Sequence, residues 1–268
     1  MTETELLFTE ILKCSRPDLY LNRNLHLDKD SASFISLALR RRISGEPLQY
    51  ILGKTEFMGL EFRITPDVFI PRPETELLVE EVVKIVSCAM CHVSSVNILD
   101  IGTGSGCIAV SLAKSLPGAC IDAMDISEKA LEIAKSNAKL NNVNINFIKS
   151  DLFASRELGI ASYDIIVSNP PYIPTPEIDK LQPEISYEPR IALDGGEDGL
   201  NYYRRIISEA APYLHTRGLL IMEIGCAQLN KIKDIFKKQG NFKIQEVVKD
   251  YNSINRVVVA RVYNANFR

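Results

Sequence analysis

The chain has 268 residues and a mass of 30.0 kDa, which is enough for one large α/β domain and a smaller one. Its formal net charge is −3 and its sequence pI is about 5.8, which argues against a domain that wraps nucleic acid mainly through phosphate contacts. No apolar run approaches the length of a membrane span, and residues 1–20 lack the basic segment of a secretory signal. We therefore expect a cytoplasmic protein that does not bind nucleic acid directly.

Six cysteines, at positions 14, 88, 91, 107, 120 and 226, lie mostly inside or beside expected core elements. They are typical of reduced, small hydrophobic residues in a cytosolic protein. The run from Cys88 through Cys91 to His92 resembles a metal or redox spacing, but no second ligand pair accompanies it. We expect no metal site, and the role of Cys88 and Cys91 stays open.

Residues 1–55 are expected to form a small helical domain that docks a substrate. Apolar residues recur at helical spacing on two faces. The faces consist of Leu6, Leu7, Ile11 and Leu12, and of Phe34, Leu37, Ala38 and Ile43. Three arginines at 40–42 end the second pattern, where cations suit a helix C-terminus, with docking as the alternative.

Residues 56–74 are expected to link the two domains. A short hairpin is predicted from Phe57 to Ile70, with turn residues at Gly59 and Pro66. The prolines that flank Arg72, and the acids that follow, then open a helix predicted over 75–88. Arg72 and Glu74 fit either a helix start with a surface ion pair or a lid over an active site.

Residues 75–268 alternate between strand and helix patterns. Strands are predicted at 96–101, 119–124, 145–149, 163–168, 218–224, 242–249 and 256–262. Further helices are predicted at 105–115, 127–141, 200–214 and 226–239. This order predicts an α/β, Rossmann-like, seven-stranded and mostly parallel sheet. The short connection between the last two strands predicts a hairpin, so one strand runs antiparallel.

The predicted strand 163–168 ends abruptly in the run Asn169-Pro170-Pro171-Tyr172. A central strand cannot continue through proline, and Asn169 is pushed to an extended backbone by the proline that follows. The Asn169 side-chain oxygen and the Pro170 carbonyl oxygen are two acceptors that can converge on one planar NH2 group, on which Tyr172 can stack. In isolation this run also fits a proline-rich turn with a capping asparagine.

A glycine loop follows the first predicted strand of the sheet and opens a helix. It reads Asp100-Ile-Gly102-Thr103-Gly104-Ser105-Gly106, followed by Cys107. Glycines let the backbone approach a ligand closely, and the helix N-terminus offers free N–H groups. The spacing departs from the dinucleotide pattern, and a carboxylate at the loop disfavours a pyrophosphate, so a cationic or amino-acid-bearing ligand fits better than NAD.

Two further acids follow the next two predicted strands. Asp125, before Ile126, is placed to bind both ribose hydroxyls of a nucleoside, or alternatively to cap the next helix, a role that Ser127 could fill. Asp151 could accept from an adenine amino group while Leu152 packs on the ring. Three acids at the carboxyl ends of consecutive strands predict a nucleoside site without phosphates.

Together these residues resemble the class I S-adenosylmethionine-dependent methyltransferases, and the Asn-Pro-Pro-Tyr run resembles the motif of enzymes that methylate planar amino or amide nitrogens. Nearly the whole chain resembles the peptide chain release factor glutamine methyltransferases, the HemK/PrmC family. The stretches that carry this closer resemblance are 45–50 (Gly-Glu-Pro-Leu-Gln-Tyr), 72–76 (Arg-Pro-Glu-Thr-Glu), 100–107, 194–200 and 223–225. One departure is Leu152, where some relatives carry an aromatic residue.

The resemblance implies methylation of N5 of the glutamine in the Gly-Gly-Gln loop of class I release factors. It implies S-adenosyl-L-methionine as cofactor, bound by the glycine loop, the three acids, Ile126, Leu152 and Asn169, with the Asn-Pro-Pro-Tyr run as the catalytic segment. We expect a monomer. Two alternatives stay open: an amino-methylating DNA or RNA methyltransferase, for which the composition shows no basic groove, and a non-catalytic S-adenosylmethionine-binding protein.

Overall fold

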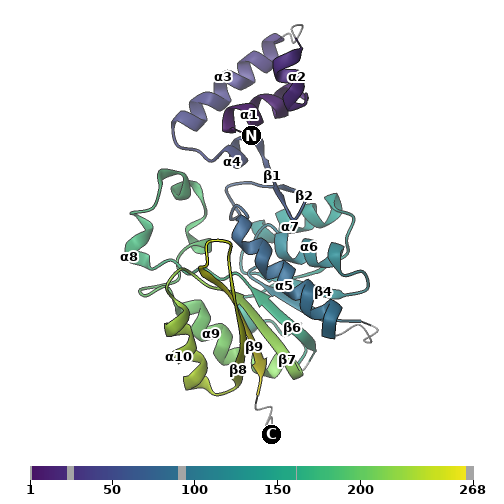
Figure 1. The fold of residues 1–268 in the computed structure, drawn as a ribbon, viewed down its shortest axis with the longest axis vertical. Coiled ribbons are helices and arrows are strands. Elements are labelled where there is room, and N and C mark those ends of the chain that lie inside the picture. The colour runs from purple at the N-terminus through teal and green to yellow at the C-terminus, as the bar shows by residue number, and fades with distance from the viewer. Residues whose placement is uncertain (1, 23–26, 90–94, 161, 264–268) are drawn as a thin grey trace.

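A computed structural model describes residues 2–22, 27–89, 95–160 and 162–263. The protein consists of a small group of helices at the N-terminal end, a two-stranded hairpin and a larger α/β domain (Figure 1). Within these described residues, no helix combines the length and the apolar character needed to span a membrane.

The N-terminal domain contains α1 (Glu3–Leu12), α2 (Arg16–Leu21), α3 (Lys29–Ile43) and α4 (Leu48–Leu52). The first three begin at side-chain caps, Thr2, Ser15 and Asp28, each of which accepts a backbone N–H of the first turn. Its small core consists of Leu7, Ala38, Leu48 and Ile51, with Ile11 and Leu52 packed against it.

The predicted second apolar face is wrong for three of its four members. Ala38 is buried, but Phe34, Leu37 and Ile43 are exposed. The short α4 packs against α1 and α3 and fills the interior instead. Two of the three arginines at 40–42 form ion pairs: Arg41 with Glu46 at 2.5 Å, and Arg42 with Glu3 at 2.9 Å and with Glu184, in the α/β domain, at 3.1 Å.

The hairpin consists of β1 (Lys54–Phe57) and β2 (Leu60–Arg63), so it begins earlier and ends earlier than predicted. Met58 and Gly59 form its two-residue turn, and both have positive φ, which matches the right-handed twist of the strands. After the hairpin, Val68 and Ile70 are buried in the same core as the sheet of the larger domain. The linker is therefore an integral part of that domain's packing.

A buried asparagine joins the hairpin to the larger domain. Asn137, on α7 (Glu128–Leu140), accepts from the Arg63 N–H at 2.7 Å and donates to the Arg63 carbonyl at 3.0 Å. Its amide also donates to the carbonyl of Ser105 in the glycine loop at 2.9 Å. One side chain thus ties together three segments that are distant in sequence.

Asn137→Ala is expected to lower the free energy of unfolding by about 2 to 4 kcal/mol, because it leaves one buried and two part-buried backbone groups without partners. The exposed Asn144→Ala is the matched control and is expected to change it by less than about 0.5 kcal/mol. Urea unfolding followed by circular dichroism measures both. Equal midpoints for the two variants would contradict this account of Asn137.

The seven-stranded sheet has the order β5-β4-β3-β6-β7-β9-β8. Its strands are β3 (Asn97–Ile101), β4 (Cys120–Asp125), β5 (Asn146–Lys149), β6 (Tyr163–Ser168), β7 (Leu214–Glu223), β8 (Phe242–Lys249) and β9 (Asn255–Val262). β3 to β7 pair in parallel, whereas β9 inserts antiparallel to both β7 and β8. The predicted Rossmann-like sheet with one antiparallel strand is confirmed.

Helices cover both faces of this sheet (Figure 1). One face carries α5 (Pro73–Ala89), α6 (Cys107–Ser115) and α7, and the other carries α9 (Asn201–Glu209) and α10 (Leu229–Gln239). Adjacent strand residues such as Ile98 and Leu99 are both fully buried but belong to cores on opposite faces. The continuous apolar strands of the sequence follow from this burial on two sides.

The predicted helix 200–214 is wrong in its second half. α9 ends at Glu209, because Pro212 cannot donate to a continuing helix, and β7 already begins at Leu214. The expectation of buried cysteines is also wrong: Cys107 is buried, but Cys88, Cys120 and Cys226 are exposed. Cys91 and His92 lie outside the described residues.

Candidate active site

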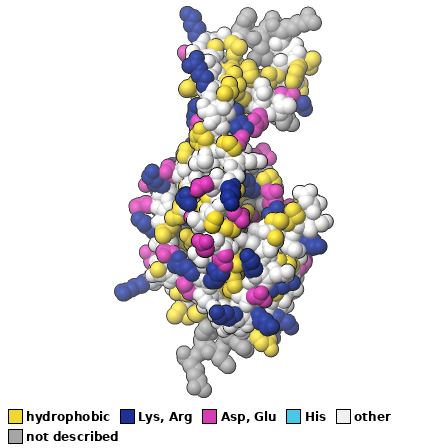
Figure 2. All heavy atoms as spheres, turned by 90° about the vertical axis from the view of Figure 1, so that its left-hand side faces the viewer, with side chains coloured by type: hydrophobic (Ala, Val, Ile, Leu, Met, Phe, Trp, Pro, Cys, Tyr) yellow, Lys and Arg dark blue, Asp and Glu magenta, His cyan; other side chains and the backbone are white. Residues whose placement is uncertain are grey.

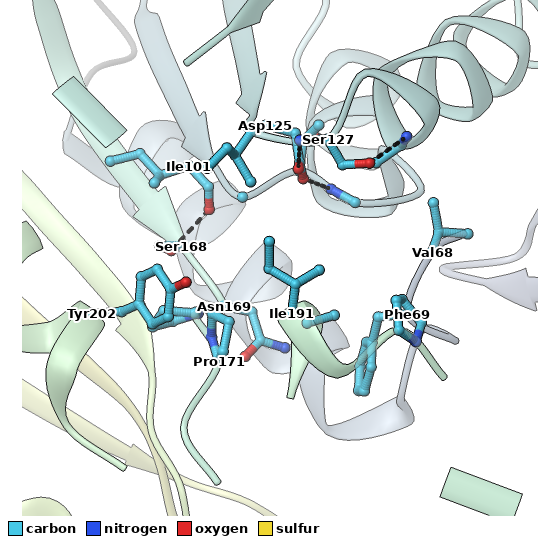
Figure 3. Close-up of a pocket in the computed structure, with 18 of the residues that line it drawn as sticks. Val68, Phe69, Ile101, Asp125, Ser127, Ser168, Asn169, Pro171, Ile191 and Tyr202 are labelled. Atoms are coloured by element: carbon cyan, nitrogen blue, oxygen red, sulfur yellow. Dashed lines mark hydrogen bonds between the residues drawn. The ribbon is translucent and has the colours of Figure 1, made fainter. Parts of the chain in front are cut away.

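A cavity opens at the carboxyl ends of β3, β4, β5 and β6, where ligands bind in open α/β sheets (Figure 3). Twelve of the sequence-predicted site residues line it: Gly102, Thr103, Gly104, Ser105, Asp125, Ile126, Asp151, Leu152, Asn169, Pro170, Pro171 and Tyr172. Four do not: Asp100, Gly106, Arg72 and Glu74. The structure thus brings most of the separate sequence motifs together around one space.

The glycines of the glycine loop have two different structural roles. Gly102 and Gly104 have positive φ and line the cavity, and a Cβ atom added at either would meet nothing within 4 Å. A Cβ atom at Gly106 would lie 3.0 Å from the Cβ of Ala134 on α7. The first two glycines therefore leave backbone open toward a ligand, whereas Gly106 allows α6 and α7 to pack closely.

Asp125 ends β4 and points toward the glycine loop (Figure 3). Its Oδ2 accepts the N–H of Gly104 at 2.9 Å and its Oδ1 accepts the N–H of Ser127 at 2.9 Å. Burial raises the pKa of this carboxyl, and the backbone hydrogen bonds oppose that rise. The cap of α7 is Ser127, which accepts from the Ala130 N–H, so the alternative capping role of Asp125 is wrong.

Asp100 lies beneath the loop, fully buried. Thr103 donates its hydroxyl to Asp100 Oδ2 at 2.6 Å, while Oδ1 has no hydrogen-bond partner among the described residues. Burial raises the pKa of Asp100 to about 7, and the nearby Asp125 carboxylate adds to the shift. Asp100 therefore holds the loop from below, through Thr103, without lining the cavity.

Asp151 and Leu152 follow β5 at the same edge of the sheet. Asp151 pairs with Arg205 of α9 through one oxygen at 3.0 Å, which leaves the other oxygen free to accept from a ligand. Leu152 is buried with a positive φ of 49°, and it lines the cavity beside Asp151. Ile126, which is 48% exposed, provides a further apolar surface on this side.

The run Asn169-Pro170-Pro171-Tyr172 leaves the end of β6 and forms the opposite wall (Figure 3). The Asn169 amide donates from Nδ2 to the Thr75 hydroxyl at 3.1 Å. Neither Asn169 Oδ1 nor the Pro170 carbonyl accepts a hydrogen bond from the described part of the chain. Two acceptors next to the cavity are therefore available to a ligand.

Tyr172, the last residue of this run, is held by residues that the sequence did not predict as part of the site. Gln228 donates from Nε2 to the Tyr172 carbonyl at 2.9 Å and accepts the Gly225 N–H at 3.1 Å. A Cβ atom at Gly199 would lie 2.4 Å from the same carbonyl, and one at Gly225 would lie 3.0 Å from the Tyr172 ring. The glycine-containing stretches at 194–200 and 223–225 are the sequence signal for this close packing.

A part-buried ion pair between Arg72 and Glu188 adjoins the cavity. Arg72 donates to Glu188, whose side chain is 1% exposed and which also accepts the Ile70 N–H at 3.1 Å. The Arg72 guanidinium stacks 4.7 Å from the ring centroid of Phe69, which lines the cavity. Arg72 therefore contacts the cavity lining only through Phe69, and its role as part of a lid stays a prediction.

The polar groups that line the cavity suit a nucleoside without phosphates. Its acids are Asp67, Asp125 and Asp151, and no lysine or arginine of the described chain lines it. Apolar residues such as Val68, Met124 and Ile191 form much of the remaining surface. An acidic, largely apolar cavity disfavours phosphate and favours a ligand with hydroxyl, amino and cationic groups.

Known methyltransferases are similar to this chain over nearly its whole length. The model of the Methyltransferase small domain matches residues 73–181, and that of the PrmC N-terminal domain matches residues 1–53. A release factor glutamine methyltransferase from Geobacter sulfurreducens is 43% identical over 261 residues, which are 97% of this chain and 89% of that protein. The chain belongs to the release factor glutamine methyltransferase family. A second relative of that name, from Thermodesulfovibrio yellowstonii, is 42% identical over 96% of this chain and 91% of its own length.

Solved structures confirm the methyltransferase fold of this family member. A ribosomal protein L11 methylase from Lactobacillus delbrueckii subsp. bulgaricus matches 76% of this chain and 86% of its own, with a TM-score of 0.52 and 22% identity. A methyltransferase from Pyrococcus furiosus matches 87% and 98% with a TM-score of 0.55 and 17% identity. The protein is thus an S-adenosylmethionine-dependent methyltransferase by family and by fold.

Proposed function

We propose that this protein methylates the side-chain amide nitrogen, N5, of the glutamine in the Gly-Gly-Gln loop of class I peptide chain release factors. The observation that carries the proposal is the pair of unoccupied acceptors, Asn169 Oδ1 and the Pro170 carbonyl, beside an acidic nucleoside cavity in a member of this family. A primary amide has two N–H donors on one planar nitrogen, which is the group that two converging acceptors fit.

The residues of the cavity fit S-adenosylmethionine. The Asp125 carboxylate, held by two backbone N–H groups, has lone pairs left for the two ribose hydroxyls. The free oxygen of Asp151 would accept from the adenine amino group, between the apolar side chains of Ile126 and Leu152. The open backbone of the loop 102–105, with the Asp100 carboxyl group beneath it, suits the aminoacyl part. When bound, the cofactor supplies an electrophilic methyl group on a sulfonium.

The protein's contribution to the reaction is positioning. An amide nitrogen is a poor nucleophile, because its lone pair is delocalised into the carbonyl group. If Asn169 Oδ1 and the Pro170 carbonyl each accept one N–H, the nitrogen is held at a fixed place and its developing positive charge meets two aimed dipoles. Orientation of this kind contributes roughly 7 to 11 kcal/mol in favourable cases, and the preorganised dipoles contribute further. The excess proton then passes to water.

Two other activities are less well supported. An amino-methylating DNA or RNA methyltransferase would share the Asn-Pro-Pro-Tyr run but would require a surface for phosphate contacts. Figure 2 shows basic and acidic side chains interspersed over one face of the molecule, in keeping with the net charge of −3. A non-catalytic cofactor-binding protein would have no use for an acceptor pair at the cavity wall.

One methyl-transfer assay tests the function. The protein is incubated with radiolabelled S-adenosylmethionine and a purified class I release factor, with the factor's Gln→Ala loop variant, or with duplex DNA and RNA. Labelling of the wild-type factor alone is the expected result. Labelling of the nucleic acid, or of the loop variant as strongly as of the wild type, would overturn the proposal.

We also propose that the protein acts as a cytoplasmic monomer that contacts the release factor without binding nucleic acid directly, and that residues 1–55 dock the factor. Light scattering of the free protein is expected to give a mass close to 30 kDa. A stable dimer at micromolar concentration would contradict the monomer.

A further inference from the structure

The buried carboxylate of Glu223 lies next to the catalytic run. Glu223 ends β7, which is the parallel neighbour of β6, and the register pairs Ser168 with Met222. Asn169 and Glu223 are therefore the next residues on two adjacent strands. Glu223 is 1% exposed, its Oε2 has no hydrogen-bond partner among the described residues, and it does not line the cavity. A buried carboxylate oxygen without a hydrogen-bond partner costs free energy, so the position of Glu223 beside Asn169 calls for a functional explanation.

Thr75 lies between this carboxylate and the reacting end of the cavity. It occupies the first turn of α5, is 2% exposed and lines the cavity. Its hydroxyl oxygen accepts from Asn169 Nδ2 at 3.1 Å. Hydrogen bonding toward Thr75 and Asn169 lowers the pKa of Glu223, against the larger effect of its burial.

The directions of these hydrogen bonds follow from their chemistry. When Glu223 is ionised it can only accept, so a hydrogen bond between Thr75 and Glu223 uses the single hydroxyl proton of Thr75. The same hydroxyl can then only accept from Asn169, which requires the NH2 end of the Asn169 amide to face inward. If the Asn169 amide rotated by 180°, its oxygen would face the Thr75 and Glu223 oxygens, which are acceptors. Its NH2 group would then face the N–H donors of the substrate amide.

We propose that Thr75 and Glu223 are positioning residues that lock the Asn169 amide with Nδ2 inward and Oδ1 toward the reacting nitrogen. This inference rests on the proposed function and deepens it. Both residues act through Asn169, so their loss changes the chemical step more than it changes cofactor binding. Protonation of Glu223 removes the lock, because a protonated carboxyl can donate to Asn169 Oδ1 and compete with the substrate.

The surroundings of Glu223 give this lock a pH dependence. Burial raises the pKa of Glu223 to about 7, against the hydrogen bonds from Thr75 and Asn169. The charged and titratable groups that face it from neighbouring elements are Arg256, which lowers its pKa, Glu74, which raises it, and Tyr172, Tyr203 and Cys107. Because the pKa is raised above its ordinary value, the carboxylate becomes fully ionised only above neutral pH. Turnover is therefore expected to rise between pH 6 and pH 8.

The first test replaces Glu223 by glutamine, which keeps its size and removes its charge. Glu223→Gln is expected to lower kcat for release factor methylation by about tenfold to a hundredfold and to remove the rise in turnover around pH 7. Its Kd for S-adenosylmethionine, measured by calorimetry, is expected to stay within about twofold of the wild type. The control is Glu246→Gln on β8, whose side chain is 52% exposed and which is expected to keep both kcat and the pH profile.

The second test uses Thr75, which allows a comparison with and without the hydroxyl. Thr75→Val keeps the shape and is expected to lose about as much kcat as Glu223→Gln, whereas Thr75→Ser, which restores the hydroxyl, recovers most of it. The double variant of Thr75→Val and Glu223→Gln is expected to be no worse than either single one, since both break one chain of hydrogen bonds.

Three results would overturn the inference: wild-type kcat in Thr75→Val, an unchanged pH profile in Glu223→Gln, or additive losses in the double variant. Failure of the proposed function looks different, because the wild-type protein itself would then leave the release factor unlabelled. If the wild type labels the release factor and the variants label it equally well, only the positioning role of Thr75 and Glu223 is refuted.

Discussion

Asn169→Ala is expected to lose about a hundredfold to a thousandfold in methyl transfer to a release factor while it still binds S-adenosylmethionine. Asn169 Oδ1 is one of two acceptors next to the cavity without a partner in the described chain, and removal of one aimed dipole at a reacting centre costs about this much. In the proposed function, cofactor binding rests chiefly on Asp125, Asp151 and the glycine loop, which the substitution does not touch.

Single-turnover methylation and calorimetry measure the two effects separately. Asn144→Ala, at an exposed position outside the cavity, is the control for the preparation and is expected to match the wild type in both. Wild-type turnover in Asn169→Ala would refute the acceptor role. A loss of cofactor binding equal to the loss of turnover would mean that Asn169 serves the cofactor and not the amide.

Asp125→Ala is expected to weaken S-adenosylmethionine binding by about a hundredfold. Hydrogen bonds to a charged group contribute about 1.5 to 3 kcal/mol each, and about 1.4 kcal/mol corresponds to a tenfold change in affinity. The substitution also leaves the N–H groups of Gly104 and Ser127 without their acceptor, so the loop that lines the cavity loses an anchor.

The matched control is Asp234→Ala, which removes an exposed aspartate from α10 on the far side of the sheet. Calorimetry with S-adenosylmethionine is the direct measurement, and saturating cofactor is expected to restore part of the turnover of Asp125→Ala. Unchanged affinity would remove Asp125 from the ribose site. An effect of equal size in Asp234→Ala would show that the loss reflects charge alone.

The residues that line the cavity come from separate parts of the chain. The acids and the glycine loop follow β3, β4 and β5 and form the part of the cavity proposed to bind the cofactor, and the run after β6 forms the part proposed to bind the amide. Glu223, at the end of β7, is proposed to position Asn169 of that run. Each parallel strand delivers one functional group to the same edge of the sheet, because consecutive right-handed crossovers return every strand in the same direction.

Local patterns in the sequence predicted most of the fold and much of the site. The strands from Asn97 to Val262 are apolar and separated by amphipathic helices, and the short connection before Asn255 forces one antiparallel strand. The glycine loop and Asn169-Pro170-Pro171-Tyr172 are recognisable because glycine and proline impose backbone conformations that depend on nearest neighbours only. The conformation of such residues can therefore be predicted from the local sequence, without knowledge of the rest of the fold.

Tertiary structure alone decided which residues support those motifs. Thr75 lies 94 positions before Asn169 and Glu223 lies 54 positions after it, and only the sheet order and the packing of α5 bring them together. The same is true of Glu188 with Arg72, 116 positions apart. Packing also decided that Phe34 and Ile43 stay exposed, since helical periodicity shows an apolar face but not whether a partner covers it. The sequence by itself determined that Asn169 leaves the end of β6 in an extended conformation before two prolines; the fold determined that its amide contacts Thr75.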